Sequence, residues 1–351
     1  MKQILISGYY GFENAGDEAV LSGLIVGLRN NAPASQLEIA ALSIAPKNTE
    51  YLHQITAKHR YKELLPALLK TDLLLSGGGS LLQDVTSAHG IFYYLAVVRI
   101  AQIMGCKTMF VAQGIGPLTR KRSIKLTASV ANGLDAIAVR DNASCELLQS
   151  IGVTKTINIT ADPALLLDPG PHAKQDGILL SMRKWKESSS QLESDLARAL
   201  LRIALPRRVE ALNMYGDNDA EAADHVIRQL HYPGYNPVQG VSHPDFRRLL
   251  GSVAASEMVI GMRLHALIFA AAAGVSAVGL SYDPKVTAFM HQLGQDDAVA
   301  DISTADTNIL SATIGAVWKT RQDRAEAIKK KLLSIRPLAQ RNADIAYHLL
   351  R

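Results

Sequence analysis

Short apolar runs alternate with segments of helical periodicity over most of the chain. Five runs rich in Ile, Leu and Val, namely ILIS, LLLSG, TMFVAQG, AIAVR and INIT, each precede a turn and a helix-period segment such as DEAVLSGLIVGLRN. Such runs suit strands that are buried on both faces, and strands of this kind belong to parallel sheets covered by helices. The pattern therefore predicts an α/β fold.

The alternating pattern is interrupted once and then begins again. Residues 162–177, DPALLLDPGPHAKQDG, gather Pro, Gly and Asp and are interpreted as a linker. A second series follows, with ILLSM, a helix expected from about Ser188, RVEALNMYG, EMVIG, RLHALIFAAAAG and AVGLSY. We predict two Rossmann-like domains that face one another across a cleft, at residues 1–168 and 177–318.

The last segment differs from both series. Residues 319–351 are charged and amphipathic, which predicts a helix or helix pair packing back across the domains. Pro337 lies inside this segment, and a proline within a helix removes one hydrogen bond and clashes with the preceding turn. We therefore expect Pro337 to kink or break the helix.

The composition is that of a globular protein long enough for two domains, with 351 residues, 48% hydrophobic and 20% charged. The formal charge of +5 suits anionic small molecules, anionic lipid or nucleic acid, without choosing among them. Cys106 and Cys145 lack metal-binding spacing, so we expect neither a disulfide framework nor a zinc site. This cysteine usage is typical of a protein in the reducing cytoplasm. GIFYYLAVVRIAQIMG is too short to span a membrane and contains Arg99, and the N-terminus resembles a strand rather than a signal peptide.

Ligands of open parallel sheets bind beyond the carboxyl ends of the strands, so the segments there are the candidate sites. The first, SGYYGFENAGDEA, places glycines around Asn14 and Asp17. It matches neither the dinucleotide fingerprint nor the phosphate-binding loop of nucleoside triphosphatases. Glycines permit a close ligand approach, but a tight turn with Asp17 as the helix cap explains the segment equally well.

Two further glycine-rich segments, LLLSGGGSLLQD and VAQGIGPL, are predicted to follow apolar strands. Three consecutive glycines favour close approach by a ligand over a simple turn, because they cost backbone entropy. The candidate binding residues of these segments are Gly78, Gly79, Ser80, Gln83, Asp84 and Gln113. For Asp84, helix capping is as good an explanation as ligand binding.

Basic residues follow three of the predicted strands. Arg140 ends AIAVR, Arg263 and His265 stand where EMVIG leads into a helix expected from Leu264, and Lys285 follows AVGLSY. The amino end of a helix attracts anions, and three fixed cations with one imidazole are typical of an anion site with an acid or base in it. We expect the four side chains to converge on one cleft from both domains. A packed histidine at a helix start is the alternative for His265.

In their order along the chain, these segments resemble the polysaccharide pyruvyltransferase family. The resemblance rests on GYYGFENAGDEA, LLLSGGGSLLQD, VAQGIGPL, AIAVRD, SMRKW, GMRLHALIFAAAAGV and LSYDPKV, and runs to about Gly294. It is closest to the S-layer-associated bacterial members of the CsaB type. The resemblance implies the GT-B glycosyltransferase architecture and transfer of pyruvate from phosphoenolpyruvate onto two hydroxyls of one sugar, with a cyclic ketal and phosphate as products.

The resemblance also implies residue roles. Arg140, Arg263, Leu264, His265 and Lys285 occupy the positions expected to bind phosphoenolpyruvate, with Arg140, Arg263 and His265 as the catalytic residues. The acceptor would be an N-acetylmannosamine-type sugar on a lipid-linked cell-wall precursor, bound largely by the N-terminal domain. Its candidate contacts are Asn14, Asp17, Gly78, Gly79, Ser80, Gln83, Asp84, Gln113 and Tyr282. One departure is Gly216 before Asp217, where family members carry a Pro-containing segment that ends in Asp.

This function would require neither a metal nor an organic cofactor, and phosphoenolpyruvate would be a co-substrate. We expect no nucleic acid partner, and we expect a cytoplasmic enzyme that makes peripheral contact with the inner membrane face through its excess positive charge. The rival function is a nucleotide-sugar-dependent glycosyltransferase, which suits the same fold and a cationic cleft. A non-catalytic sugar-binding or scaffold protein is less favoured, because it needs no histidine among separated cations.

Overall fold

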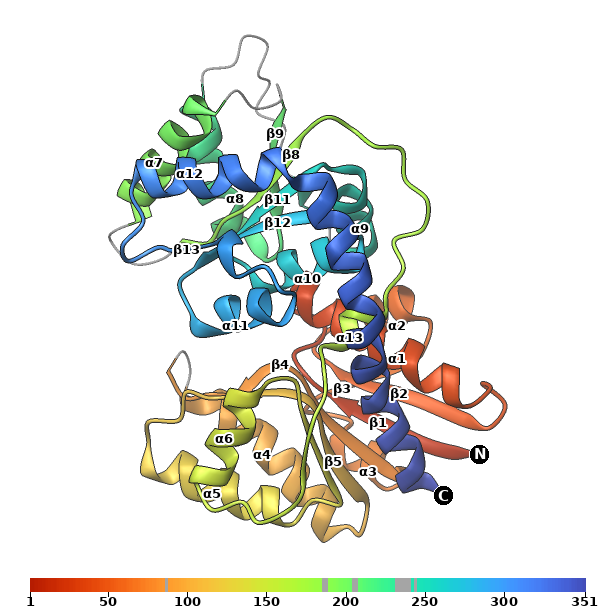
Figure 1. Ribbon diagram of the computed structural model, residues 1–351. Helices are drawn as coiled ribbons and strands as arrows, with labels where there is room; N and C mark the ends of the chain where they lie inside the picture. Colours follow the sequence, from red (N-terminus) through yellow and green to blue (C-terminus); the bar gives the residue numbers. More distant parts are fainter. Residues whose placement is uncertain (86–87, 185–188, 204–207, 231–240, 243–244) are drawn as a thin grey trace. The chain divides into compact units, whose positions relative to one another are not determined.

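The protein divides into two compact units, each built around one parallel sheet, in a computed structural model (Figure 1). Unit 1 comprises residues 1–167 and 335–351, and unit 2 comprises residues 168–334. The structure describes residues 1–85, 88–184, 189–203, 208–230, 241–242 and 245–351.

The described part of unit 1 contains a seven-stranded sheet in the order β3-β2-β1-β4-β5-β6-β7, with parallel pairing throughout. Its strands are β1 (Lys2–Ser7), β2 (Leu37–Ser43), β3 (Thr56–His59), β4 (Leu73–Leu82), β5 (Lys107–Ile115), β6 (Ala136–Val139) and β7 (Ile157–Ile159). Its helices are α1 (Ala15–Asn31), α2 (Pro46–His53), α3 (Leu64–Leu68), α4 (Ala88–Ile103), α5 (Lys121–Asn132), α6 (Asn142–Ser150) and the 3₁₀ helix η1 (Pro163–Leu166). The strand order reverses between β1 and β4, where such sheets bind ligands.

Unit 2 repeats this plan. Its described strands form a six-stranded parallel sheet in the order β10-β9-β8-β11-β12-β13, and the order reverses between β8 and β11. The strands are β8 (Ile178–Ser181), β9 (Val209–Asn213), β10 (Val241–Ser242), β11 (Met258–Gly261), β12 (Ser276–Ser281) and β13 (Val299–Asp301). The helices are α7 (Ser189–Arg202), α8 (Gly216–Arg228), α9 (Phe246–Ala255), α10 (Leu264–Ala272), α11 (Pro284–Gln292), η2 (Asp296–Ala298) and α12 (Thr307–Lys319). Helix α13 (Arg321–Leu350) begins in unit 2 and ends in unit 1.

The predicted α/β fold with two Rossmann-like parallel sheets is thus confirmed. All five apolar runs of the first series form strands, and β8, β9, β11 and β12 coincide with the strands of the second. The helix expected from about Ser188 begins at Ser189, and Ser188 itself lies outside the described residues. The predicted cleft between the domains stays a prediction.

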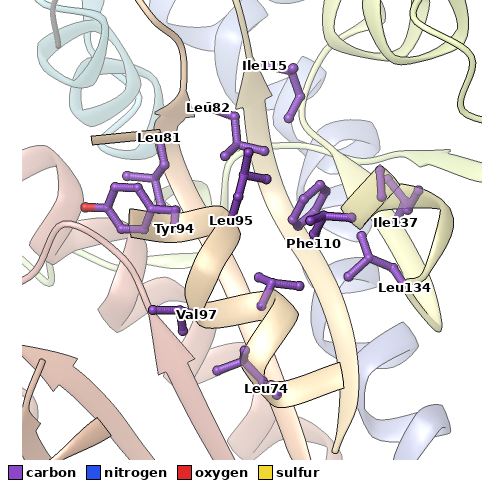
Figure 2. Packing of buried hydrophobic residues seen from close by; sticks show 14 of the residues in the cluster. Leu74, Leu81, Leu82, Tyr94, Leu95, Val97, Phe110, Ile115, Leu134 and Ile137 are labelled. Carbon is purple, nitrogen blue, oxygen red and sulfur yellow. The ribbon is translucent and has the colours of Figure 1, made fainter. Parts of the chain in front are cut away.

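The apolar segment that contains Arg99 is helix α4, which packs against the sheet of unit 1. Figure 2 shows Leu95 of α4 beside the strand residues Leu82 and Phe110, and all three are almost fully buried. Removal of such side chains from water contributes roughly 1.5–3 kcal/mol each to folding. Within the described ranges, every helix is too short or too polar to cross a membrane.

Helix α13 runs without interruption from Arg321 to Leu350 and includes Pro337. The helix is therefore not broken at Pro337, and the alternative expectation of a kink there stays a prediction. A proline leaves the carbonyl four residues before it without its helical hydrogen bond, and here that residue is Leu333, which is 77% exposed. Water can bond this carbonyl, which lowers the cost of the proline enough for the helix to continue.

The close contact between α1 and η1 yields a stability prediction. A Cβ atom added at Gly23 of α1 would lie 2.1 Å from the carbonyl oxygen of Pro163, which is backbone and cannot rotate away. We expect Gly23→Ala to destabilise the protein by about 1–3 kcal/mol in urea unfolding, as overpacked cores do. The control is Gly315→Ala in α12, where the nearest atoms lie 3.8 Å away and Ala should stabilise by roughly 0.5–1 kcal/mol. Equal effects at both positions would contradict the prediction.

Candidate active site

An arginine and an aspartate form the centre of a polar cluster at the carboxyl edge of the unit 2 sheet. Arg263 lies two residues after the end of β11 and directly before α10, and Asp219 lies in the first turn of α8, after β9. Arg263 donates through Nε to Asp219 Oδ2 at 2.9 Å and through Nη2 to Asp219 Oδ1 at 2.6 Å. The backbone N–H of Tyr215 donates to the same carboxylate at 3.1 Å. This fork-to-carboxylate geometry fixes the guanidinium plane.

The electrostatics of this pair depend on burial. Asp219 is fully buried, whereas the Arg263 side chain is 19% exposed. Burial raises the pKa of Asp219, and the hydrogen bonds and positive charge of Arg263 oppose that rise. The pairing with Arg263 is thus the main interaction that opposes protonation of Asp219, and Arg263 Nη1 has no hydrogen bond to any described residue.

Two more cations lie at the same edge. Arg183, which follows β8, donates to the Tyr282 hydroxyl at 3.1 Å and lies 5.3 Å from the centre of its ring. Because β11 lies between β8 and β12, this contact crosses the end of β11, where Arg263 stands. Lys285 Nζ lies 5.9 Å from the Tyr282 ring centre and 3.2 Å from Asp283 Oδ2. Unit 2 thus gathers Arg183, Arg263 and Lys285 around the ends of three adjacent strands.

The helix start that was expected near Leu264 is confirmed, since α10 begins there with Arg263 as its N-cap residue. His265 is the second helical residue and its side chain is half-buried. Leu264 is 8% exposed, so its side chain belongs to the core, and the backbone N–H is what it can offer a ligand. Free N–H groups of a first helical turn attract anions.

Two buried polar atoms occur beside these cations. Ser181 Oγ ends β8 and Asn213 Oδ1 ends β9, and neither has a hydrogen-bond partner among the described residues. Buried polar groups are nearly always hydrogen-bonded, and an unsatisfied one costs about 1–3 kcal/mol. Ser181 lies at the strand-order reversal, and this position together with the cations favours a site for a polar, negatively charged ligand at this edge.

Arg140 lies in unit 1 and is held in a buried ion pair. Its side chain is 6% exposed, and it donates to Asp162 Oδ2 at 2.8 Å and to Ser80 Oγ at 3.0 Å. Asp162 in turn accepts the backbone N–H of Ala164 at 3.0 Å. Arg140 therefore joins β4, β6 and η1. The predicted convergence of Arg140 with Arg263, His265 and Lys285 stays a prediction.

The glycine-rich segments were assigned wrongly to loops after strands. Gly77, Gly78 and Gly79 lie inside β4, and Gln113 lies inside β5. The three glycines have φ values of 152°, 78° and 89°, which favour glycine, and an added Cβ would lie 2.0–2.4 Å from Val111 O, Val20 Cγ1 or Asp17 Oδ1. Close packing within unit 1, rather than approach by a ligand, is thus sufficient to require them.

The alternative explanation of Asp17 as the helix cap was also wrong. Asn14 is the N-cap of α1 and accepts the N–H of Gly16 at 3.1 Å, whereas Asp17 lies within the helix, buried against Gly79. Gln83 accepts the N–H of Val85 at 3.0 Å in the turn after β4. The amide atoms of Gln113 are buried without a partner among the described residues, as are Ser7 Oγ and Ser76 Oγ near the strand reversal of unit 1. Unit 1 therefore also carries unsatisfied polar groups at the place where such sheets bind ligands.

Asp84 holds the loop before α5. Its carboxylate accepts the N–H groups of Thr119 and Arg120 at 2.8 and 2.9 Å, and the Thr119 hydroxyl at 2.9 Å. Burial by itself would raise the pKa of Asp84, but these hydrogen bonds outweigh it and the pKa is lowered. The contacts favour the structural explanation of Asp84 over a direct contact with an acceptor.

Replacing Asp84 by Asn should therefore cost stability. At pH 7 we expect a loss of roughly 1.5–3 kcal/mol in urea unfolding, the usual value of hydrogen bonds to a charged group. Because folding lowers this pKa, the contribution is present above the unfolded carboxyl value of about 3.9 and is lost as the pH falls through the folded value. The difference between Asp84→Asn and the parent should thus narrow below about pH 4. Exposed Asp323→Asn is the control, and an equal loss there would contradict the prediction.

Sequence reasoning missed Asp219, Arg183 and Tyr215, although the segments RVEALNMYG and SMRKW contain Tyr215 and Arg183. The signal for Asp219 was present in YGDNDAEA, where acidic residues follow a strand of the second sheet. The side chain of Asp217, in the same segment, lies outside the described residues, as does Trp185. Cys106 and Cys145 are free cysteines.

Comparison with known proteins shows the family to which this sequence is similar. Residues 14–284 match the family model described as polysaccharide pyruvyl transferase. The amylovoran biosynthesis protein AmsJ of Erwinia amylovora is 22% identical over 98% of this chain and 99% of its own. The matched range contains every cation of the unit 2 cluster except Lys285, which follows its last residue.

Solved structures show the likeness of fold. The UDP-GlcNAc 2-epimerase of Neisseria meningitidis, bound to UDP-GlcNAc, has a TM-score of 0.61 at 11% identity and covers 100% of this chain and 99% of its own. HepE of Anabaena, in complex with UDP and glucose, has a TM-score of 0.63 at 12% identity over 99% of both chains. At such identities the likeness concerns the GT-B-type fold and not the reaction.

Proposed function

The chain belongs to the polysaccharide pyruvyl transferase family, and we propose that it moves pyruvate from phosphoenolpyruvate onto two hydroxyls of one sugar. The products would be a cyclic ketal and phosphate. The observation that carries the proposal, beside the family, is the cluster of Arg183, Arg263 and Lys285 at the strand-order reversal of unit 2. Phosphoenolpyruvate bears a carboxylate and a phosphate, which suit arginine forks and a lysine point charge.

Arg263 is the proposed clamp of the donor. Asp219 holds its guanidinium through Nε and Nη2, so that Nη1 can meet an anionic group of the donor in a fixed orientation. A hydrogen-bonding side chain that is already oriented contributes more to binding affinity than a mobile one, because less side-chain entropy is lost when the ligand binds. Asp219 acts here as a positioning residue, since it works through Arg263.

His265 is the proposed proton donor. Protonation of C3 of the enol makes C2 electrophilic, one sugar hydroxyl attacks C2, phosphate leaves, and the second hydroxyl closes the ring. One hydroxyl proton replaces the proton given to C3, and the other leaves with phosphate, so the reaction balances. An imidazole can exchange a proton at cellular pH, and its place in the first turn of α10 puts it beside Arg263 in the chain. Fixed cations supply the charge in this scheme, so we propose no metal or organic cofactor.

Arg140 is retained in the proposal as a residue that supports the site from unit 1. Its buried pairing with Asp162 occupies Nη1, so a direct contact with phosphoenolpyruvate would have to use the remaining donors. Unit 1 is the proposed source of the acceptor contacts. Gln113 is a proposed acceptor contact because its buried amide has no partner among the described residues, and a sugar could reach this amide only if neighbouring side chains move.

For the acceptor, we propose a lipid-linked polysaccharide precursor at the inner face of the cytoplasmic membrane, with an N-acetylmannosamine-type sugar as the first candidate. Motif resemblance to the CsaB type supports that sugar, and the departure at Gly216 weighs against it. AmsJ is named for amylovoran biosynthesis, so a panel of acceptors must also include the sugars of amylovoran.

The deciding experiment offers the protein phosphoenolpyruvate or nucleotide sugars, each with the acceptor panel. We expect acceptor-dependent phosphate release with phosphoenolpyruvate and none with nucleotide sugars. Mass spectrometry should then find a product heavier than the acceptor by one pyruvic acid less one water. The rival glycosyltransferase activity would instead give a product heavier by a sugar residue, from a nucleotide sugar. That outcome, without any ketal, would overturn the proposal.

A further inference from the structure

The excess positive charge of the chain arises in one segment. Residues 85–134 contain six Lys and Arg residues and no Asp or Glu, which leaves 31 basic and 32 acidic residues for the rest of the chain. The formal charge of +5 is therefore not spread over the molecule. The segment therefore brings six positive charges and no negative charge of its own to the part of unit 1 in which it lies.

Four of these six cations stand together at the start of α5. Arg120, Lys121, Arg122 and Lys125 are all exposed, and none takes part in an ion pair with a described residue. The opposite face of α5 is buried through residues such as Thr127 and Val130. Figure 1 shows α5 beside α4 and α6 in unit 1. The helix thus has one face in the core and one cationic face toward solvent.

Exposed apolar side chains accompany these cations. Leu126 of α5 is 40% exposed, and Val85 in the turn after β4 is 62% exposed. Asp84 joins the two places, because its carboxylate accepts the backbone N–H groups of Thr119 and Arg120. Val85 therefore lies next to the segment that starts α5. We call Val85, Leu126 and the four cations the α5 surface.

We propose that the α5 surface docks on an anionic lipid bilayer. Cations beside exposed aliphatic side chains suit a headgroup region, where basic residues meet anionic lipids and apolar residues enter the acyl boundary. A second copy of the chain is disfavoured as partner, because a symmetric contact would oppose four unpaired cations with four more. Nucleic acid would use the cations but not Val85 and Leu126. The purpose of docking rests on the proposed function: the α5 surface adjoins the carboxyl ends of β4 and β5, near the acceptor contacts proposed in unit 1.

Vesicle binding tests the α5 surface without any substrate. The probe is a phosphatidylcholine vesicle with or without phosphatidylglycerol, and binding is measured by co-sedimentation of the full chain. We expect binding only with phosphatidylglycerol, weakening as salt rises, since exposed charges are screened beyond about 8 Å at physiological ionic strength. The double variant Lys121→Gln, Lys125→Gln should lower the partition coefficient about 25- to 30-fold, because each cation lost near an anionic surface weakens binding about fivefold.

Matched variants elsewhere separate this surface from net charge. Lys330→Gln with Lys331→Gln, at exposed positions on α13, removes the same two charges and should change binding less than about twofold. Leu126→Ser should weaken binding, whereas Leu333→Ser at the 77% exposed position on α13 should not. Equal losses in both lysine pairs, binding equally strong to neutral vesicles, or no binding to anionic vesicles would each overturn the inference.

The proposed function is tested by a different measurement, the release of phosphate. Phosphate release on a water-soluble acceptor should be unchanged in the Lys121→Gln, Lys125→Gln variant, because neither residue belongs to the proposed site. If the vesicle results hold and no variant or parent protein releases phosphate, the function falls and the α5 surface stands. Stronger binding to DNA than to anionic vesicles, or a dimer that the Lys121→Gln, Lys125→Gln change strengthens, would overturn the choice of lipid.

Discussion

Replacing His265 by Gln should leave binding of phosphoenolpyruvate nearly unchanged and lower turnover by about 10²–10⁴-fold, the usual contribution of general acid catalysis. Glutamine is close in volume and keeps a hydrogen-bonding amide, but it cannot deliver a proton to C3. The change lies in the first turn of α10, where Gln is an adequate helix former, so folding should be preserved. Phosphate release under saturating donor measures turnover, and donor binding is measured separately by calorimetry.

His291→Gln is the matched control. His291 lies in unit 2 at the last turn of α11, is 77% exposed and pairs with Asp296. We expect its loss to leave turnover within about twofold of the parent, as surface substitutions usually do. Turnover of His265→Gln within a few-fold of the parent would show that His265 is not the acid. A packed histidine at the helix start would then be its role.

Replacing Arg263 by Lys should weaken donor binding by about 10- to 150-fold, which corresponds to the roughly 1.5–3 kcal/mol of a hydrogen bond to a charged group. Lysine keeps the charge but cannot bond both oxygens of Asp219 and still offer a planar donor to the ligand. Asp219, which is fully buried, would also lose part of its compensation. The KM for phosphoenolpyruvate should therefore rise more than kcat falls.

Asp219→Asn should give the same pattern as Arg263→Lys, because it releases the guanidinium plane. The double variant should bind the donor no more weakly than the more impaired of the two single variants, because the effects of residues that act as a unit are not additive. Arg198→Lys is the control, as Arg198 pairs with Asp195 at 2.8 Å on α7 with 53% of its side chain exposed. Unchanged donor affinity in Arg263→Lys would refute the clamp.

Much of the fold was predictable because its strands are buried on both faces and carry continuous apolar runs. The apolar periods predicted β1, β4, β5, β6 and β11 and the parallel arrangement. They did not mark where β4 ends, because the glycines that continue this strand look like turn residues. Backbone packing against Val111 and Val20 decided those positions, and such contacts connect residues far apart in the chain.

The candidate site was predictable to the extent that it follows strands. Arg263 and Lys285 could be placed at the carboxyl edge from the position of their strands alone. Asp219 could not be paired with Arg263, because that requires knowing that β9 and β11 both flank β8. Arg140 was expected to be open to a ligand, and its buried partner Asp162 lies 22 residues further along the chain, within the segment interpreted as a linker.

The last turns of α13 have a consequence for how the protein is made. Asn342 is fully buried, accepts the N–H of Ala112 and the Thr160 hydroxyl at 3.0 Å, and donates to Ala161 O at 2.9 Å. Three points of unit 1 that precede unit 2 in the chain are thus bonded by a residue that the ribosome adds only after unit 2. A nascent chain halted after residue 167 would leave the Ala112 N–H and the Ala161 carbonyl without this partner, so unit 1 should stay open to proteases until synthesis passes Asn342, while unit 2 can close before it.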